Sequence, residues 1–320
     1  MKLALIGVGE IAQKAYLPLL KTMEGVQISS VMSRSAQSVK NAQARWQIPT
    51  GFTRLKDVID SRPDACLVLT TTTTHFEVAK ELLEAGMDVF LEKPATVRSE
   101  EIKTLADLAA KNSRILMVAY NRRFADFYVQ ARNLFNTDEI LQITLEKHRP
   151  FPSYNSLYSQ YLDDTIHIID LLRFFDSNPV PLHTVVTMRK DQPWSAVSTL
   201  RLSGGGIATI HACLGAGSWQ EKVSVHGARK TVIVNAFRDL TYINEEGIHV
   251  FGPERPSSWK SELAERGFDA ELRHFMDCVR NRKTPITDGY EAYKTQVLVE
   301  QLTQLAGEPL EHQERDRNAK

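Results

Sequence analysis

A glycine-rich turn directly after the first apolar run constrains the fold of this chain most. Residues 2–6 are predicted to form a short buried strand, and Gly7-Val8-Gly9-Glu10-Ile11-Ala12 follows them as a G-x-G-x-x-A pattern that opens a helix. In such a turn Gly7 permits the sharp strand-to-helix reversal, Gly9 lets the backbone approach a pyrophosphate, and the small Ala12 lets the helix pack on the strand. This position between strand and helix predicts a dinucleotide site, with a purely structural tight turn as the alternative.

The first 120 residues alternate between strand-like and helix-like segments. Apolar runs predict strands over 26–32, 65–70, 88–91 and 115–119, and helical patterns cover 35–46, 76–85 and 99–111. Strands that alternate with helices of this length are typical of right-handed βαβ units, which build a parallel sheet. Because several of these strands are continuous apolar runs, both faces of the sheet are expected to be covered by helices.

A different pattern begins near residue 125. Strand-like segments follow one another with few helices between them, at 140–147, 184–190, 196–202, 207–214, 222–226 and 231–236. Helical patterns return at 161–175, 260–281 and 288–305. The sequence therefore predicts an α/β protein of two domains, an N-terminal Rossmann dinucleotide-binding domain (1–121) and a C-terminal α+β domain with a large, mostly antiparallel sheet (122–320).

Charge and composition exclude several classes of protein. The chain has 39 basic and 39 acidic side chains, which argues against a nucleic-acid-binding protein because such proteins carry a basic face. The three widely spaced cysteines, Cys66, Cys213 and Cys278, fit neither a disulfide framework nor a CxxC pair, and we expect no metal site. No apolar stretch is long enough to span a membrane, and no signal peptide precedes the first strand, so a cytoplasmic location is expected.

The end of the second predicted strand bears on the choice of cofactor. NAD sites commonly place an Asp or Glu there to accept a hydrogen bond from the ribose 2′-hydroxyl, and this chain has Ser33 and Arg34 instead. A guanidinium forms paired hydrogen bonds with phosphate oxygens, which favours the 2′-phosphate of NADP. We therefore predict NADP rather than NAD, and the alternative is that Arg34 merely points into solvent.

Two further patches contain residues that could do chemistry. Glu92-Lys93-Pro94 follows the predicted strand 88–91, so it lies at the carboxyl edge where sheets of this kind bind ligands. Asp163 and His167 are four residues apart and share one face of a predicted helix, with Asp170 three residues further on. A lysine at a sheet edge and an Asp–His pair on a helix are suited to holding a substrate oxygen and moving one proton.

These patches, with the glycine turn, resemble the family of glucose–fructose oxidoreductase and inositol dehydrogenase, known as Gfo/Idh/MocA. The resemblance extends along nearly the whole chain. The other segments that carry it are Thr70 with His75, Asn121-Arg122-Arg123-Phe124, Gly267-Phe268 and Ile286-Thr287-Asp288-Gly289. The pairing of Glu-Lys-Pro with Asp-x-x-x-His is specific for the family but not for a substrate.

The resemblance implies an NAD(P)-dependent oxidoreductase acting on the CH–OH group of a sugar, polyol or related hydroxy or keto compound. It implies catalytic roles for Lys93, Asp163 and His167. Because hydride transfer belongs to the nicotinamide, the protein must place the substrate and manage a proton, and His167 suits that task. The residues expected around the cofactor are Gly7, Gly9, Glu10, Ile11, Ala12, Ser33, Arg34, Thr70, Thr71, His75, Glu92 and Lys93.

Several of these residues have structural alternatives. His167 could instead be a buried core histidine. Asp163 or Asp164 could serve as a helix N-cap and have no catalytic role. Asp170 is expected to be structural, and His75 could either line a nicotinamide pocket or cap a helix. Family members commonly have glycine where this chain has Thr165, so the second hypothesis is a catalytically silent NAD(P)-binding regulator or sensor.

Substrate contacts and self-association are the remaining expectations. Arg122, Tyr154, Asp163 and His167 are predicted to contact a sugar-like substrate, because arginines bind hydroxyl or acid groups and aromatic rings stack on sugar faces. Weaker candidates of the same kind are Arg123, Tyr158 and Trp219. Family members are commonly dimers or tetramers built through the C-terminal sheet, and the resemblance implies a homodimer or homotetramer here. No nucleic acid or membrane partner is expected.

Overall fold

The computed structural model describes residues 1–150, 154–252 and 260–312. The chain forms two compact units: unit 1 contains Met1–Tyr120 and Phe268–Lys294, and unit 2 contains Asn121–Gly267 and Thr295–Lys320. The sequence predicts one boundary after residue 121, so it misses that residues 268–294 return to unit 1. Within unit 1 the ring of Phe275 packs on that of Phe90, with centroids 5.4 Å apart. The predicted C-terminal domain also includes 151–153, 253–259 and 313–320, which lie outside the described residues.

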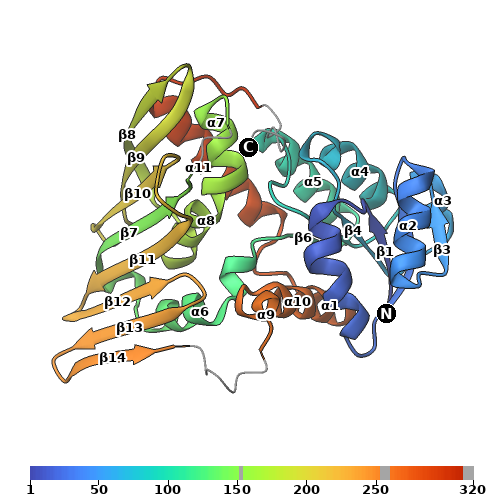
Figure 1. Ribbon diagram of the computed structural model, residues 1–320, viewed down its shortest axis with the longest axis horizontal. Coiled ribbons are helices and arrows are strands. Elements are labelled where there is room, and N and C mark those ends of the chain that lie inside the picture. The colour runs from blue at the N-terminus through green and yellow to red at the C-terminus, as the bar shows by residue number, and fades with distance from the viewer. Residues whose placement is uncertain (151–153, 253–259, 313–320) are drawn as a thin grey trace. The chain divides into compact units, whose positions relative to one another are not determined.

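Unit 1 is built on a six-stranded parallel sheet of order β3-β2-β1-β4-β5-β6 (Figure 1). Every side chain of the β4 run Ala65–Val68 is 0% exposed, so both faces of the sheet are covered, as the apolar runs predict. The Rossmann fold class is therefore confirmed. The strands are β1 Lys2–Ile6, β2 Gln27–Met32, β3 Thr50–Phe52, β4 Ala65–Val68, β5 Val89–Leu91 and β6 Leu116–Val118.

Helices connect the strands of unit 1 in the predicted alternation. Ser35 begins α2 by accepting a hydrogen bond from the Ser38 backbone N–H, 3.2 Å away, as a serine N-cap does. The sequence does not predict β3 or α3, because both are short and β3 lacks an apolar alternation. The helices are η1 Ala12–Tyr16, α1 Leu17–Thr22, α2 Ala36–Trp46, α3 Leu55–Asp60, α4 Thr72–Glu84, α5 Ser99–Lys111 and α10 Phe268–Asn281, and α11 Gly289–Leu305 begins here and continues into unit 2.

Unit 2 contains an eight-stranded sheet of order β14-β13-β12-β11-β7-β10-β9-β8 (Figure 1). Only the β10–β7 pair of this described sheet is parallel, so the mostly antiparallel prediction is confirmed. The sequence misses β13 and β14, and in β14 the apolar side chains Ile248, Val250 and Phe251 are exposed rather than part of the core. The strands are β7 Ile140–His148, β8 Val180–Arg189, β9 Gln192–Arg201, β10 Ile207–Cys213, β11 Gln220–Gly227, β12 Lys230–Asn235, β13 Asp239–Asn244 and β14 Gly247–Phe251.

Helices lie along one face of this sheet (Figure 1). Two of them, α6 and α8, contact β12 and β7 respectively. Alternation along β9 agrees with this, because Ala196, Ser198 and Leu200 are buried whereas Val197 and Arg201 are exposed. The helical segments of unit 2 are η2 Asn121–Phe124, α6 Asp126–Asn133, η3 Thr137–Glu139, α7 Leu157–Gln160, η4 Tyr161–Thr165, α8 Ile166–Phe175 and α9 Glu262–Glu265.

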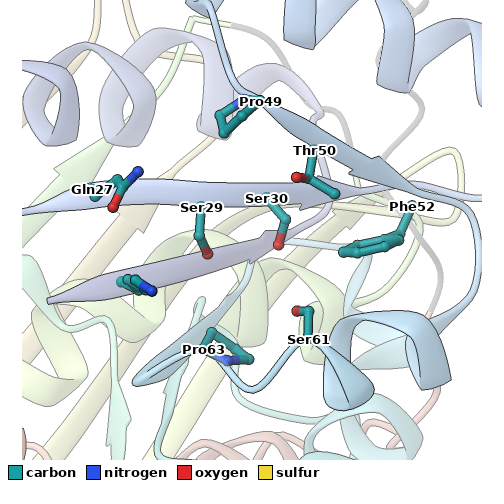
Figure 2. Close-up of a pocket in the computed structure, with 9 residues that line it drawn as sticks. Gln27, Ser29, Ser30, Pro49, Thr50, Phe52, Ser61 and Pro63 are labelled. Carbon is teal, nitrogen blue, oxygen red and sulfur yellow. The ribbon is translucent and has the colours of Figure 1, made fainter.

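A small cavity of about 210 Å³ lies against β2 and β3 of unit 1 (Figure 2). A β-bulge makes Ser29 the extra residue between Ile28 and Ser30, so both serine side chains point toward the cavity. The Ser29 hydroxyl donates to the Leu3 carbonyl at 3.0 Å, whereas the buried Ser30 hydroxyl has no hydrogen-bond partner among the described residues. No residue lining this cavity is a predicted site residue; they are Lys2, Gln27, Ser29, Ser30, Pro49, Thr50, Phe52, Ser61 and Pro63.

The two neighbouring serines give opposite stability predictions. Ser30→Val removes an unpartnered buried hydroxyl and fills part of the cavity, so we expect the free energy of unfolding to rise by about 1 kcal/mol. Ser29→Val breaks a bond to the Leu3 carbonyl and should lower the same quantity by about 1 kcal/mol. Urea unfolding of the three proteins measures both changes. If Ser30→Val is as destabilising as Ser29→Val, the prediction for Ser30 is wrong.

Candidate active site

The glycine turn has the geometry that dinucleotide binding requires. Gly7 has φ +99°, and a Cβ there would lie 2.6 Å from the carbonyl carbon of Leu69, so only glycine fits. At Gly9 a Cβ would meet nothing within 4 Å, which leaves open space in front of the backbone. The chain is helical from Glu10 onward, so the backbone N–H groups at the start of this helix are directed toward this end of the turn. The residues present therefore fit a pyrophosphate group.

The helix after this turn begins with an unusual segment. Ala12 is fully buried, as close packing of helix and strand demands. Residues Ala12–Tyr16 form a π-helical turn, a feature often found at functional sites. The Glu10 carboxylate pairs with Lys14 on the exposed side of the helix at 2.5 Å, so Glu10 can contribute its backbone rather than its side chain to a phosphate. The Tyr16 side chain points into the unit and is 0% exposed.

The predicted cofactor-selecting residues follow β2. The backbone N–H of Ser33 donates to the Phe52 carbonyl at 3.2 Å, which fixes the start of the turn. Arg34 is exposed, and no carboxylate pairs with it in the described part of the chain. Its guanidinium is therefore available for an anion, as an NADP-binding residue would need to be.

The residues that follow β4 lie at the same carboxyl edge of the unit 1 sheet as the glycine turn. Thr71 is exposed and precedes α4, and the Thr70 hydroxyl accepts a hydrogen bond from that of Thr74 at 2.9 Å. His75 is buried, and its Nδ1 and Nε2 each lie 3.0 Å from a backbone carbonyl, of Pro94 and Thr70 respectively. Burial lowers the pKa of His75, although these carbonyls oppose the effect. His75 thus links two backbone segments and does not cap α4, whose N-cap is Thr71.

Lys93 lies between two fixed neighbours at the end of β5. The Glu92 backbone N–H donates to the Val68 carbonyl at 3.0 Å, and its side chain accepts a 2.6 Å hydrogen bond from the Tyr16 hydroxyl. On the other side, the Lys93–Pro94 peptide is cis and the Pro94 carbonyl contacts His75. Lys93 itself is half-buried. Unit 1 therefore presents one lysine at the same sheet edge as the glycine turn.

Asp163 and His167 lie in one continuous helical run of unit 2, from Leu157 to Phe175. The run begins at Ser156, whose hydroxyl accepts from the Ser159 N–H at 3.1 Å, so the predicted capping roles of Asp163 and Asp164 are wrong. Asp163 lies within the π-turn Tyr161–Thr165, where its carboxylate accepts a 2.8 Å hydrogen bond from the Tyr154 hydroxyl. Both Asp163 and His167 are half-buried, so neither is a closed core residue.

Asp164, beside Asp163, belongs to a buried ion network. Burial would raise the pKa of its carboxyl, but Lys147 and Arg149 outweigh this and hold that pKa below its usual range. The Lys147 ammonium lies 3.8 Å from Asp164 and 2.7 Å from Glu221. Glu221 is likewise buried, yet Arg122 and Lys147 keep its pKa well below the usual value. The direct partner of Asp164 is Arg149, which follows β7 and anchors the π-turn that carries Asp163.

The predicted role of Arg122 as a substrate residue is not supported by its contacts. Its guanidinium is buried and donates to both carboxylate oxygens of Glu221, at 3.2 and 3.0 Å. Arg123 is buried in the same way against Asp170, which confirms a structural Asp170. Such buried pairs are costly to break and hold the fold of unit 2. The sequence alone does not tell whether an arginine binds a ligand or forms an internal ion pair. That depends on whether the fold brings a carboxylate from a distant part of the chain next to it.

The aromatic substrate candidates are also engaged within unit 2. Tyr154 is buried and bonded to Asp163, which gives it a positioning contact. Tyr158 is buried with its hydroxyl 3.3 Å from the Glu300 carboxylate, and Trp219 stacks on Phe237. No pattern in the sequence indicates the hydrogen bond from Tyr16 to Glu92, because the two residues lie 76 positions apart. Among the described residues, no group of His, Cys, Asp and Glu could hold a metal ion.

The chain is similar to known oxidoreductases in sequence and in fold. Residues 1–120 match the family model GFO_IDH_MocA, described as oxidoreductase family, NAD-binding Rossmann fold. The Salmonella typhimurium protein YceM, named as an oxidoreductase, is 29% identical over 305 residues, which cover 94% of this chain and 97% of YceM. The scyllo-inositol 2-dehydrogenase (NAD(+)) of Bacillus subtilis is 23% identical over 248 residues, covering 72% and 71%. The crystal structure of the dehydrogenase MviM from Clostridium difficile matches with TM-score 0.86 and 26% identity, covering 94% and 98%.

Fold, glycine turn and these matches together define an oxidoreductase with an NAD-binding Rossmann unit. The family match over residues 1–120 and the relatives matched along the chain support the resemblance to Gfo/Idh/MocA that the motifs predict. No helix in the described ranges is long and apolar enough to cross a membrane.

Proposed function

We propose that this protein is an NAD(P)-dependent dehydrogenase or reductase that moves hydride between nicotinamide and a CH–OH carbon of a sugar or polyol. The observation that carries the proposal is the carboxyl edge of the unit 1 sheet, where the open backbone at Gly9 and the half-buried Lys93 occur together. The inositol dehydrogenase of B. subtilis, matched over most of its length, supports a polyhydroxylated substrate. The substrate class and the site residues are both part of this proposal.

The cofactor would be held mainly by unit 1. Backbone groups of Gly7, Gly9 and the first helical turn would bind the pyrophosphate, and Arg34 would bind a ribose 2′-phosphate. Thr70, Thr71 and Glu92 would border the remainder of the bound molecule. When bound, the nicotinamide supplies or accepts the hydride.

The protein's own chemistry is positioning and proton transfer. The Lys93 ammonium would hold the reacting oxygen by a charge-assisted hydrogen bond and favour its developing negative charge. The His167 imidazole would take the hydroxyl proton during oxidation and return it during reduction. Asp163, itself held by Tyr154, would hydrogen-bond His167 or a neighbouring substrate hydroxyl.

The catalytic proposal is preferred to a silent sensor because of Thr165. This residue replaces a glycine common in the family, and its side chain is 0% exposed. The side-chain atoms that threonine has and glycine lacks therefore lie in the interior of unit 2 rather than on its surface. They need not block the binding of a substrate.

A substrate screen tests the activity directly. Purified protein is mixed with NADP or NAD and a panel of inositols, aldoses and sugar acids, and nicotinamide absorbance is followed. We expect turnover with at least one polyol or sugar. Tight cofactor binding without turnover on the full panel would favour the regulator instead, and absence of cofactor binding would contradict both.

The preference for NADP makes a separate prediction. Arg34→Ala should raise the Kd of NADP by about 10-fold or more, because a charge-assisted hydrogen bond is lost, and should change the Kd of NAD little. Lys40→Ala removes another exposed positive charge from α2 and serves as the control. Fluorescence titration measures each constant. Equal NADP affinity in the Arg34 variant and the native protein would show that NADP is not selected here.

We also propose that the uncovered face of the unit 2 sheet mediates self-association. Val185 and Val197 are direct partners across β8 and β9 and are 55% and 37% exposed. Contact between these apolar side chains and water is unfavourable. Val180, Arg201 and Ile207 form a second row on the same face. Large exposed apolar patches of this kind commonly mark protein interfaces.

A charge placed on this face should dissociate the oligomer. Val185→Asp would bury a carboxylate against the apolar partner surface, so we expect sedimentation equilibrium to report a monomer where the native protein is a dimer or tetramer. Gln37→Asp adds the same charge on the exposed side of α2 and should leave the oligomer intact. A native protein that sediments as a monomer contradicts the proposal.

A further inference from the structure

A buried hydrogen bond joins the dinucleotide-binding helix to the segment that carries Lys93. Tyr16, at the end of η1, donates to the Glu92 carboxylate at 2.6 Å, and both side chains are buried. Burial, and then the Glu92 and Glu271 carboxylates, raise the pKa of the Tyr16 phenol well above its usual value. The phenol therefore stays protonated and donates to a charged acceptor, which makes this bond a strong one.

The position of the Tyr16 ring is itself well defined. It packs edge-on against Phe90 of β5 and Phe268 of α10, with centroid distances of 5.6 and 5.7 Å. These two ring contacts define where the Tyr16 hydroxyl lies relative to β5. Since the same helix starts at the open backbone of Gly9, one rigid element serves both the expected phosphate site and Glu92.

Lys93 is consequently held from both sides. Tyr16 fixes the residue before it, and His75, 3.0 Å from the Pro94 carbonyl, fixes the residue after it. A hydrogen bond needed only for stability could be made anywhere in the core. The contacts of Tyr16 and His75 instead lie on the two sides of Lys93, the lysine that the proposed reaction requires. A displacement of about 1 Å at a reacting group can cost about 100-fold in rate.

We propose that Tyr16 is a positioning residue for the reaction: through Glu92 it sets the place of the Lys93 ammonium at the sheet edge. This inference rests on the proposed function, in which Lys93 holds the reacting oxygen. The Tyr16 side chain is fully buried, so it would act through Glu92 rather than by contact with substrate or cofactor.

The kinetic test uses Tyr16→Phe, which keeps the ring and removes the hydroxyl. We expect kcat to fall by about 10-fold or more, with the cofactor Kd and substrate KM within about twofold of native values. Tyr128→Phe is the matched control, because Tyr128 is also fully buried and donates to a buried carboxylate, Glu221, at 2.9 Å. It should change kcat by less than about twofold. If both variants lose kcat equally, Tyr16 is merely structural.

A double variant tests whether the effect passes through Glu92. Tyr16→Phe and Glu92→Gln weaken the same bond, so the double variant should be no slower than the slower single variant. Independent, multiplying losses would overturn the route through Glu92.

A third measurement does not depend on turnover. The ligand-free protein is treated with an amine-acylating reagent, and mass spectrometry compares the modification rate of Lys93 with that of the exposed Lys40. In Tyr16→Phe the relative rate at Lys93 should rise at least about threefold, and in Tyr128→Phe it should not change. An unchanged rate in Tyr16→Phe overturns the positioning role even where the enzyme turns over. A raised rate in a protein that turns over nothing contradicts the proposed function and leaves the positioning contact standing.

Discussion

Lys93→Met is expected to lower kcat by about 100- to 1,000-fold while the cofactor Kd stays near the native value. Methionine keeps the length and apolar stem of the side chain but has no ammonium to hold a developing oxyanion, and removal of one such donor costs a factor of this size. The backbone contacts on either side, at Val68 and His75, do not involve the Lys93 side chain and should survive. Single-turnover kinetics with the substrate identified in the screen measures the effect.

Two variants make this prediction specific. Lys111→Met, an exposed position at the end of α5, removes the same charge from the same unit and should leave kcat unchanged. Lys93→Arg keeps the charge but replaces a compact ammonium with a planar fork, so it should recover only part of the rate. Full activity of Lys93→Met would remove this residue from the reaction, and a large loss of cofactor binding would indicate a role in binding rather than in chemistry.

The parts of the fold that the sequence predicts well are those set by neighbours along the chain. The helix predicted over 99–111 is observed as Ser99–Lys111, and the first strand as Lys2–Ile6. The glycine turn is also local, because Gly7 must adopt a positive φ whatever lies elsewhere. In each case spacing and residue type within about 10–15 residues suffice to decide the structure.

What the sequence could not predict are partners far apart in the chain. Arg122 lies 99 residues from the Glu221 that pairs with it, and Tyr16 lies 76 residues from Glu92. From the sequence alone, the Arg122 guanidinium and the Tyr16 hydroxyl could each be assigned to a ligand. Only the folded chain brings their carboxylate acceptors within hydrogen-bond distance. The return of residues 268–294 to unit 1 has the same cause, since Phe275 meets Phe90 across almost two hundred residues.

His167→Ala is expected to give the second large loss, about 100- to 10,000-fold in kcat/KM, because the variant lacks the base proposed to accept the hydroxyl proton. Oxidation needs the neutral imidazole, so the native rate should rise as increasing pH removes the imidazolium proton, and the variant should lack this limb. Measuring kcat/KM for oxidation from acid to neutral pH tests the sign. His249→Asn, at an exposed position on β14, removes another histidine from unit 2 and should keep the native profile.

Chemical rescue separates a proton-transfer role of His167 from a packing role. The variant leaves a space beside the half-buried Asp163, and added imidazole can occupy it and accept the proton. We therefore expect imidazole to restore activity to His167→Ala in proportion to the concentration of its neutral form, and to leave Lys93→Met unaffected. If the histidine served only to pack α8, imidazole would restore stability without restoring the pH-dependent rate. The two largest predictions are thereby distinguishable, because one loss is recovered by a free base and the other is not.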